Sequence, residues 1–179
     1  MKNIIKILLL SILAYGCSAS ENPVENELYE CLIKEYKSKG IDIAALLDSM
    51  ENHCIKNGIL RDNSGESKLE FYKKIANTGE VPIMEVYEIA DSIAQIKFFQ
   101  QEIESCLNNK DFDSLTLSNS SYSRLMSSFK TVKEVNPKNA AICHVNVLTS
   151  KDYEHPYYRA HMLITFARIY ERPRAFIIK

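Results

Sequence analysis

The chain of 179 residues is long enough for one folded domain and short for two of ordinary size. Apolar residues make up 46% of it and charged residues 25%, which is typical of a globular protein and excludes a disordered tail, a collagen-like repeat and several membrane spans. With 22 basic and 23 acidic side chains, the net charge of −1 argues against binding to nucleic acid, which needs a basic surface.

The N-terminal residues have the pattern of an export signal. Lys2 and Lys6 supply positive charge, and an uncharged, largely apolar run follows from residue 7 to residue 20. A membrane-spanning helix needs ~20 apolar residues, and the end of this run is small and polar. Its length is therefore that of a signal peptide rather than a span.

The apolar run ends in Leu13-Ala14-Tyr15-Gly16-Cys17. This ending resembles the lipobox of bacterial lipoproteins, in which a small residue precedes an invariant cysteine. The resemblance covers residues 1–17 and implies that residues 1–16 are removed and that Cys17 carries the lipid that holds the protein on a membrane. The alternative is cleavage after Cys17-Ser18-Ala19, a small-x-small site, which yields a soluble secreted or periplasmic protein.

Residues 17–26 are polar after the cysteine and are interpreted as the lipidated residue and a flexible tether, with a single domain over 27–179. Asn22-Pro23 can also serve as an N-cap and first helical residue. Apolar residues at helical spacing predict helices over 27–39, 42–58 and 67–77. Their boundaries carry recognised cap and stop residues: Gly40, Asp42, Gly58, the Ser67-x-x-Glu70 box and Gly79.

The strongest helical periodicity runs from 85 to 107 and predicts a helix of ~33 Å at the centre of the fold. The Ser-, Asn- and Asp-rich stretch 108–128 predicts a loop that leads into a short helix near 122–133.

Beyond residue 136 helix and strand patterns compete. Asn136-Pro137 favours a helix over 137–148, although Cys143, Val145 and Val147 alternate with polar residues as in a strand. For 157–179 the two patterns are balanced, and 175–178 is a candidate strand. The expected fold is a compact, mostly α multi-helix bundle, with a short β-ribbon after Pro137 as an alternative.

Cysteines occur at positions 17, 31, 54, 106 and 143. If Cys17 is lipidated, four remain in an oxidising compartment, where disulfides form. We hypothesise the pairs Cys31–Cys54 and Cys106–Cys143, with four buried free thiols as the alternative. The spacing of Cys and His fits neither a zinc site nor covalent haem, so no metal and no cofactor is expected.

The C-terminal segment 156–179 is the strongest signal of a binding surface, because four of the six arginines of the chain lie in it. Arginine mixed with tyrosine is typical of a protein interface or an anion site. The alternative is a solvated basic face that balances an acidic body. The candidate interaction patch comprises Tyr157, Tyr158, Arg159, Arg168, Tyr170, Arg172 and Arg174.

The chain contains neither a G-x-S-x-G nor an H-E-x-x-H motif, and no catalytic residue is assigned. We therefore expect a membrane-anchored lipoprotein of the bacterial cell envelope, at the outer membrane or cell surface, with a non-catalytic binding or structural role. Its partner would be an envelope protein or an anionic component. The alternatives are a small secreted or envelope enzyme whose site is assembled from distant residues, and an accessory subunit of an envelope transport complex.

Overall fold

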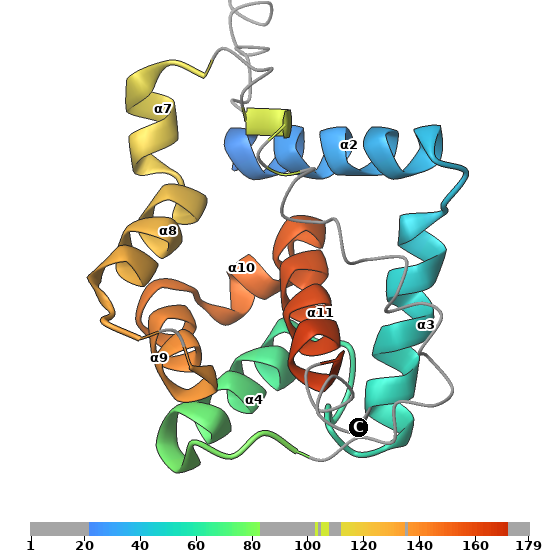
Figure 1. Ribbon diagram of the computed structural model, residues 1–179, viewed down its shortest axis with the longest axis vertical. Coiled ribbons are helices and arrows are strands. Elements are labelled where there is room, and N and C mark those ends of the chain that lie inside the picture. Colours follow the sequence, from blue (N-terminus) through green and yellow to red (C-terminus); the bar gives the residue numbers. More distant parts are fainter. Residues whose placement is uncertain (1–21, 83–102, 104, 108–111, 135, 172–179) are drawn as a thin grey trace, which may run out of the picture.

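The computed structural model describes residues 22–82, 103, 105–107, 112–134 and 136–171, with side chains described as far as residue 165. These residues form a mostly helical bundle, which confirms the expected fold class (Figure 1). The helix expected over 85–107 lies largely outside the described residues, although Ile103 and residues 105–107 are helical. The candidate strand at 175–178 lies outside them entirely.

The helices of the described residues are named in chain order. They are α2 (Pro23–Ser38), α3 (Ile43–Lys56), α4 (Gly65–Thr78), α7 (Ser114–Asn119), α8 (Ser121–Thr131), α9 (Pro137–Val147), α10 (Ser150–Glu154) and α11 (Pro156–Glu171).

The helix caps explain where several of these elements begin. The carboxylate of Asp42 accepts a hydrogen bond from the Ala45 amide at 3.0 Å at the start of α3, as the sequence predicts. At α4 the cap is Ser64 rather than the expected Ser67-x-x-Glu70 box, so Ser67 lies inside the first turn. That helix ends, as expected, at Gly79, whose φ of 75° suits glycine.

The helical domain begins earlier than the sequence indicated. Pro23 is the first residue of α2, and Val24 is completely buried in the core. Residues 23–26 therefore belong to the folded domain, and the second interpretation of Asn22-Pro23, as a helix start, is the correct one. Cys17 precedes the described residues.

The stretch 108–128, expected to be a loop, is helical from residue 114. Asp113 caps α7 by accepting from the Thr116 amide at 2.9 Å, and Ser120 caps α8 by accepting from the Ser123 amide at 3.0 Å. Short polar side chains bond equally well to loops and to helix starts. The composition that suggested a loop is therefore explained by closely spaced N-caps.

The region after Pro137 is helical through residue 171, so the short β-ribbon does not occur within the described part of it. Asn136 caps α9 and Pro137 is its first residue, as the helix interpretation requires. The favoured helix over 137–148 is confirmed, and the competing strand pattern does not hold, since the adjacent Cys143 and His144 are both buried. Since α9 packs against α4 on one side and α8 on another, its buried surface is wider than one stripe.

The core lies around α11, which contacts α2, α3 and α10 and occupies the middle of the bundle (Figure 1). Most residues in the first half of α11 are apolar and buried, with Arg159 as the charged exception. The largest completely enclosed side chains include four tyrosines, Tyr36, Tyr153, Tyr157 and Tyr158.

One buried carboxylate joins three helices. Glu25, in the first turn of α2, is 1% exposed. Its Oε1 accepts a hydrogen bond from the Tyr122 amide in the first turn of α8 at 2.9 Å and from the Tyr158 hydroxyl of α11 at 2.7 Å. Burial, and then the nearby Glu25, raise the pKa of Tyr158, so the phenol remains a donor.

The disulfide pairing differs from the hypothesis. Cys31 of α2 is bonded to Cys106, with the two Cα atoms 5.8 Å apart, while Cys54 and Cys143 are free and buried. Cys54 cannot reach Cys31 because α3 turns away from α2 (Figure 1) and Cys54 lies about 17 Å along it. Cys143 lies instead in α9, packed between α4 and α8.

Candidate functional site

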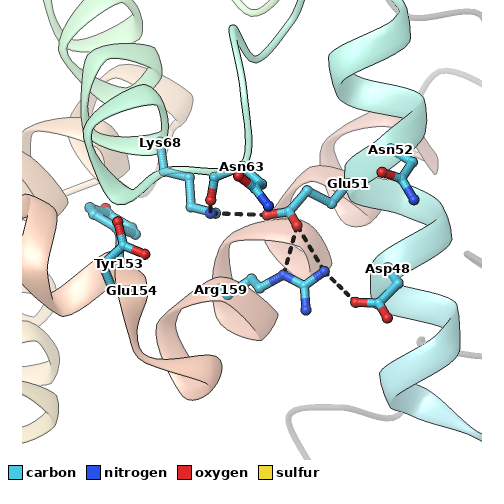
Figure 2. A pocket seen from close by; sticks show the side chains of 8 residues that line it. All are labelled: Asp48, Glu51, Asn52, Asn63, Lys68, Tyr153, Glu154 and Arg159. Carbon is cyan, nitrogen blue, oxygen red and sulfur yellow. Dashed lines mark hydrogen bonds and ion pairs between the residues drawn. The ribbon is translucent and has the colours of Figure 1, made fainter.

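A polar recess of about 410 Å³ opens where α3, α4, α10 and α11 meet (Figure 2). These segments are far apart in sequence, and the contacts of α11 with α3 and of α10 with α4 bring them together. Three carboxylates and two basic groups line it, so its net charge is negative. The lining residues are Asp48, Glu51, Asn52, Asn63, Lys68, Tyr153, Glu154 and Arg159.

Glu51 lies at the centre of the recess with a cation on either side (Figure 2). Its Oε1 is 3.0 Å from Nζ of Lys68, and its Oε2 accepts from Nε of Arg159 at 3.0 Å and lies 2.8 Å from Nη2 of that residue. The side chains of Glu51 and Lys68 are 7% and 2% exposed. Burying a charge is costly unless it is paired, and here both oxygens of Glu51 face cations.

The network continues to the surface through Arg159. Nη2 of Arg159 donates to Oδ1 of Asp48 at 2.5 Å, and the Asp48 side chain is 62% exposed. Burial lowers the pKa of Arg159, but its hydrogen bonds to Glu51 and Asp48 outweigh this and raise the pKa above its usual value. Lys68 also donates to the backbone oxygen of Asn63. Both cations of the recess are thus engaged within the protein.

The sequence places the acidic half of this network on one helix face. Asp48, Glu51 and Asn52 are spaced i, i+3 and i+4 along α3, and such residues are neighbours on a helix surface. They lie beside Leu47 and Met50 of the buried stripe, which turns this face toward α11 and α4.

The opposite wall is held by a close approach of α10 to the start of α4. Oε1 of Glu154 accepts a hydrogen bond from the Gly65 amide at 2.5 Å, where a carboxylate also complements the dipole of α4. A Cβ atom at Gly65 would lie 2.0 Å from the backbone oxygen of Ser150. Glycine is therefore required at this position by the space available.

Behind the recess, Tyr153 connects it to a buried aromatic cluster. The Tyr153 hydroxyl lies 2.8 Å from Nδ1 of His144, whose ring stacks on Tyr72 with centroids 4.1 Å apart. Burial, and then the neighbouring His161, lower the pKa of His144 well below its usual value. The imidazole is therefore neutral at physiological pH, and its Nε2 has no hydrogen-bond partner among the described residues.

The thiol of Cys54, which lies three residues after Glu51 on α3, is protonated at neutral pH. Burial, and then the negative charge of Glu51, raise the pKa of Cys54 to about 11. A thiol with such a pKa is a poor nucleophile at neutral pH, because the thiolate is the reactive form.

This arrangement is better suited to binding than to proton transfer. A general acid or base needs a titratable group that reaches the substrate, whereas both oxygens of Glu51 are occupied by cations. In the described part of the chain, Oδ2 of Asp48 and Oε2 of Glu154 accept no hydrogen bond. These two acceptors give the recess the means to hold a positively charged or hydrogen-bond-donating group.

Of the seven residues of the predicted Arg/Tyr patch, the structure describes the side chains of three, and these three do not form a common exposed surface. Tyr157 and Tyr158 are 1% exposed and belong to the core, because α11 packs against several helices at that point. Arg159 lies in the recess and is paired with acidic residues of α3. The side chains of Arg168 and Tyr170, together with Arg172 and Arg174, lie outside the described residues, as does Cys17.

Sequence reasoning missed Glu51 and Lys68. The spacing of Asp48, Glu51 and Asn52 was the available signal, since a polar triplet on one helix face can mark a site. Nothing comparable marked Lys68, which lies in a helix with several other charged residues.

Two further properties concern the described residues as a whole. No group of three or more His, Cys, Asp or Glu side chains among them is placed to hold a metal ion. Among the same residues, no helix combines the length and the apolar character that crossing a membrane would require.

No protein-family model, no curated protein and no solved structure matches this chain.

Proposed function

We propose that this protein is a lipid-anchored component of the bacterial cell envelope with a non-catalytic binding role. The observation that carries the proposal is the N-terminal pattern: basic residues, a short apolar run and Gly16-Cys17, followed closely by a folded domain that begins at Pro23. An anchor of this kind keeps a protein at a membrane surface, because two or more acyl chains bind stably where one does not.

The distance between anchor and domain supports this arrangement. Five residues separate Cys17 from Pro23, and even fully extended they span at most about 22 Å. A domain tethered so closely would work at the membrane surface, on components of the envelope within reach.

The recess is the proposed binding site, and its charge selects the kind of group it takes. Its two cations are engaged with Glu51 and Asp48, whereas carboxylate oxygens of Asp48 and Glu154 remain open to a ligand. We infer that it holds a positively charged group, such as a lysine side chain, of an envelope protein. Because Arg159 is paired with Asp48 and Glu51 of α3, we do not assign it to the binding of an anionic partner.

Intact mass of the mature protein from its native host, with the N-terminal peptide mapped, tests the anchor. The expected result is a diacylglyceryl adduct on Cys17 and loss of residues 1–16. An unmodified N-terminus at Ser20 would refute the anchor and return the soluble secreted alternative.

The binding role is tested by cross-linking the anchored protein to its membrane neighbours through amines. Asp48→Asn with Glu154→Gln removes two negative charges at the recess and keeps one side-chain oxygen at each position, for the bonds to Arg159 and to the Gly65 amide. We expect the cross-linked species to be lost. The matched control is Glu30→Gln with Glu80→Gln, which makes the same charge change at exposed positions that do not line the recess. Equal loss in both variants would show that net charge, not the recess, attracts the partner.

A further inference from the structure

Helix α7 stands apart from the other helices in its burial. None of its residues is buried, and its sequence, SLTLSN, contains no charged side chain. Leu115 is 69% exposed and is the one exposed large apolar side chain among the described residues. Elsewhere in the described part of the chain, large apolar side chains are at least partly covered. Single exposed apolar residues are common on protein surfaces, so it is the position of Leu115 that suggests what it contacts.

The position of α7 relates it to the point where the chain enters the domain. α7 contacts α2, and the first turn of α8, directly after it, is bonded through the Tyr122 amide to Glu25 in the first turn of α2. Figure 1 shows α7 beside the N-terminal end of α2. The segment that carries Cys17 therefore joins the domain at the same end of the molecule as α7.

Chain lengths place that surface within reach of the anchor. The tether spans at most about 22 Å, and α7 itself is about 9 Å long. A lipid surface that holds Cys17 lies within this distance of the start of α2 and hence near α7. In contrast, the end of α4 at Thr78 lies at the opposite end of the molecule in Figure 1.

We propose that α7 rests on the lipid surface to which the protein is anchored, with Leu115 inserted at the headgroup boundary. This inference rests on the proposed lipid anchor at Cys17. Moving an apolar side chain out of water is favourable. The residues of α7 carry no charge, and the exposed carboxylate of its N-cap, Asp113, would have to stay in water on the headgroup side. A lipid on a flexible tether fixes distance alone, whereas a second contact at α7 fixes which face of the domain points away from the membrane.

The absence of tryptophan from the chain gives a direct test, because a single introduced tryptophan reports its own surroundings. Leu115→Trp places the reporter on α7, and Asn77→Trp places it at an exposed position near the end of α4 as the matched control. Both full-length variants, purified from a host that lipidates them, are inserted into phosphatidylcholine vesicles with or without brominated chains. Intact mass establishes the adduct on Cys17 before the fluorescence is measured.

The expected result is a shift of the Leu115→Trp emission to shorter wavelength and quenching by brominated lipid, with neither effect for Asn77→Trp. If Cys17 carries lipid and the two reporters behave alike, α7 does not contact the membrane, and the anchor stands without it. If Cys17 carries no lipid, the proposed function fails, and the membrane contact of α7 fails with it. The mass and the fluorescence thus separate the two failures.

Discussion

Two ion pairs with the same N–O distance and opposite burial allow the central interaction of the recess to be tested. Nζ of Lys68 is 3.0 Å from Oε1 of Glu51, and both side chains are buried; Nη1 of Arg61 is 3.0 Å from Oε2 of Glu70, and those side chains are 58% and 49% exposed. Lys68→Met removes the buried cation and puts an unbranched apolar side chain in the place of the lysine stem. Arg61→Met does the same at the exposed pair.

We expect Lys68→Met to lower the free energy of unfolding by about 3–5 kcal/mol, because Glu51 loses one of its two cations in a buried position. In a domain of this size that loss corresponds to about 6–20 °C in Tm. Arg61→Met should have a much smaller effect, because solvent screens the exposed pair.

Urea unfolding followed by circular dichroism measures both variants. The variant Lys68→Met with Glu51→Gln should recover part of the stability, since the uncompensated negative charge is then gone. Equal losses for Lys68→Met and Arg61→Met, or no recovery in the double variant, would refute the reasoning that burial makes the Glu51 network costly to break.

Three further predictions concern other parts of the fold. Reducing the bond between Cys31 and Cys106, which are 75 residues apart, should lower the free energy of unfolding by about 4.5 kcal/mol, measured in urea with and without reductant. His144 should make the protein less stable as the pH falls below about 6.5, by up to ~1.4 kcal/mol per pH unit, because the unfolded chain takes up a proton that the buried imidazole resists. Gly65→Ala should destabilise the fold by about 1–3 kcal/mol in thermal unfolding, because its Cβ would overlap the Ser150 carbonyl.

The controls for these predictions use the same assays. In a variant with Cys31→Ala and Cys106→Ala, reductant should leave the unfolding curve unchanged. His144→Phe should flatten the pH dependence between pH 7 and 5, and an unchanged slope would assign it to other groups. A Tm for Gly65→Ala equal to that of the parent would mean that α10 can move away from α4.

The sequence predicted those features that depend on neighbouring residues. Asp42, Pro137 and Gly79 act over one helical turn, and their helices begin or end where the pattern indicates. For α9 the cap pattern at Asn136-Pro137 was the correct guide, and the competing alternation around Cys143 was not, because the burial of α9 is set by two other helices.

The recess could not be predicted from short sequence patterns for the same reason, because residues far apart in the chain form it. Arg159 pairs with Glu51 across 108 positions of the chain, and Lys68 enters from a third helix. Tyr157 looked like part of a surface because aromatic and basic residues alternate there. Its burial follows from the central position of α11, which no short pattern reveals.

The bonds of Glu25 have a mechanical consequence. A pull on the chain ahead of Pro23 would enter the domain through the first turn of α2, where the carboxylate of Glu25 bonds to the Tyr122 amide and to the Tyr158 hydroxyl. The force would then be distributed over α8 and the central helix α11. Without these bonds, α2 would separate from the bundle one turn at a time. The side chain of Glu25 thus couples the start of α2 to both α8 and α11.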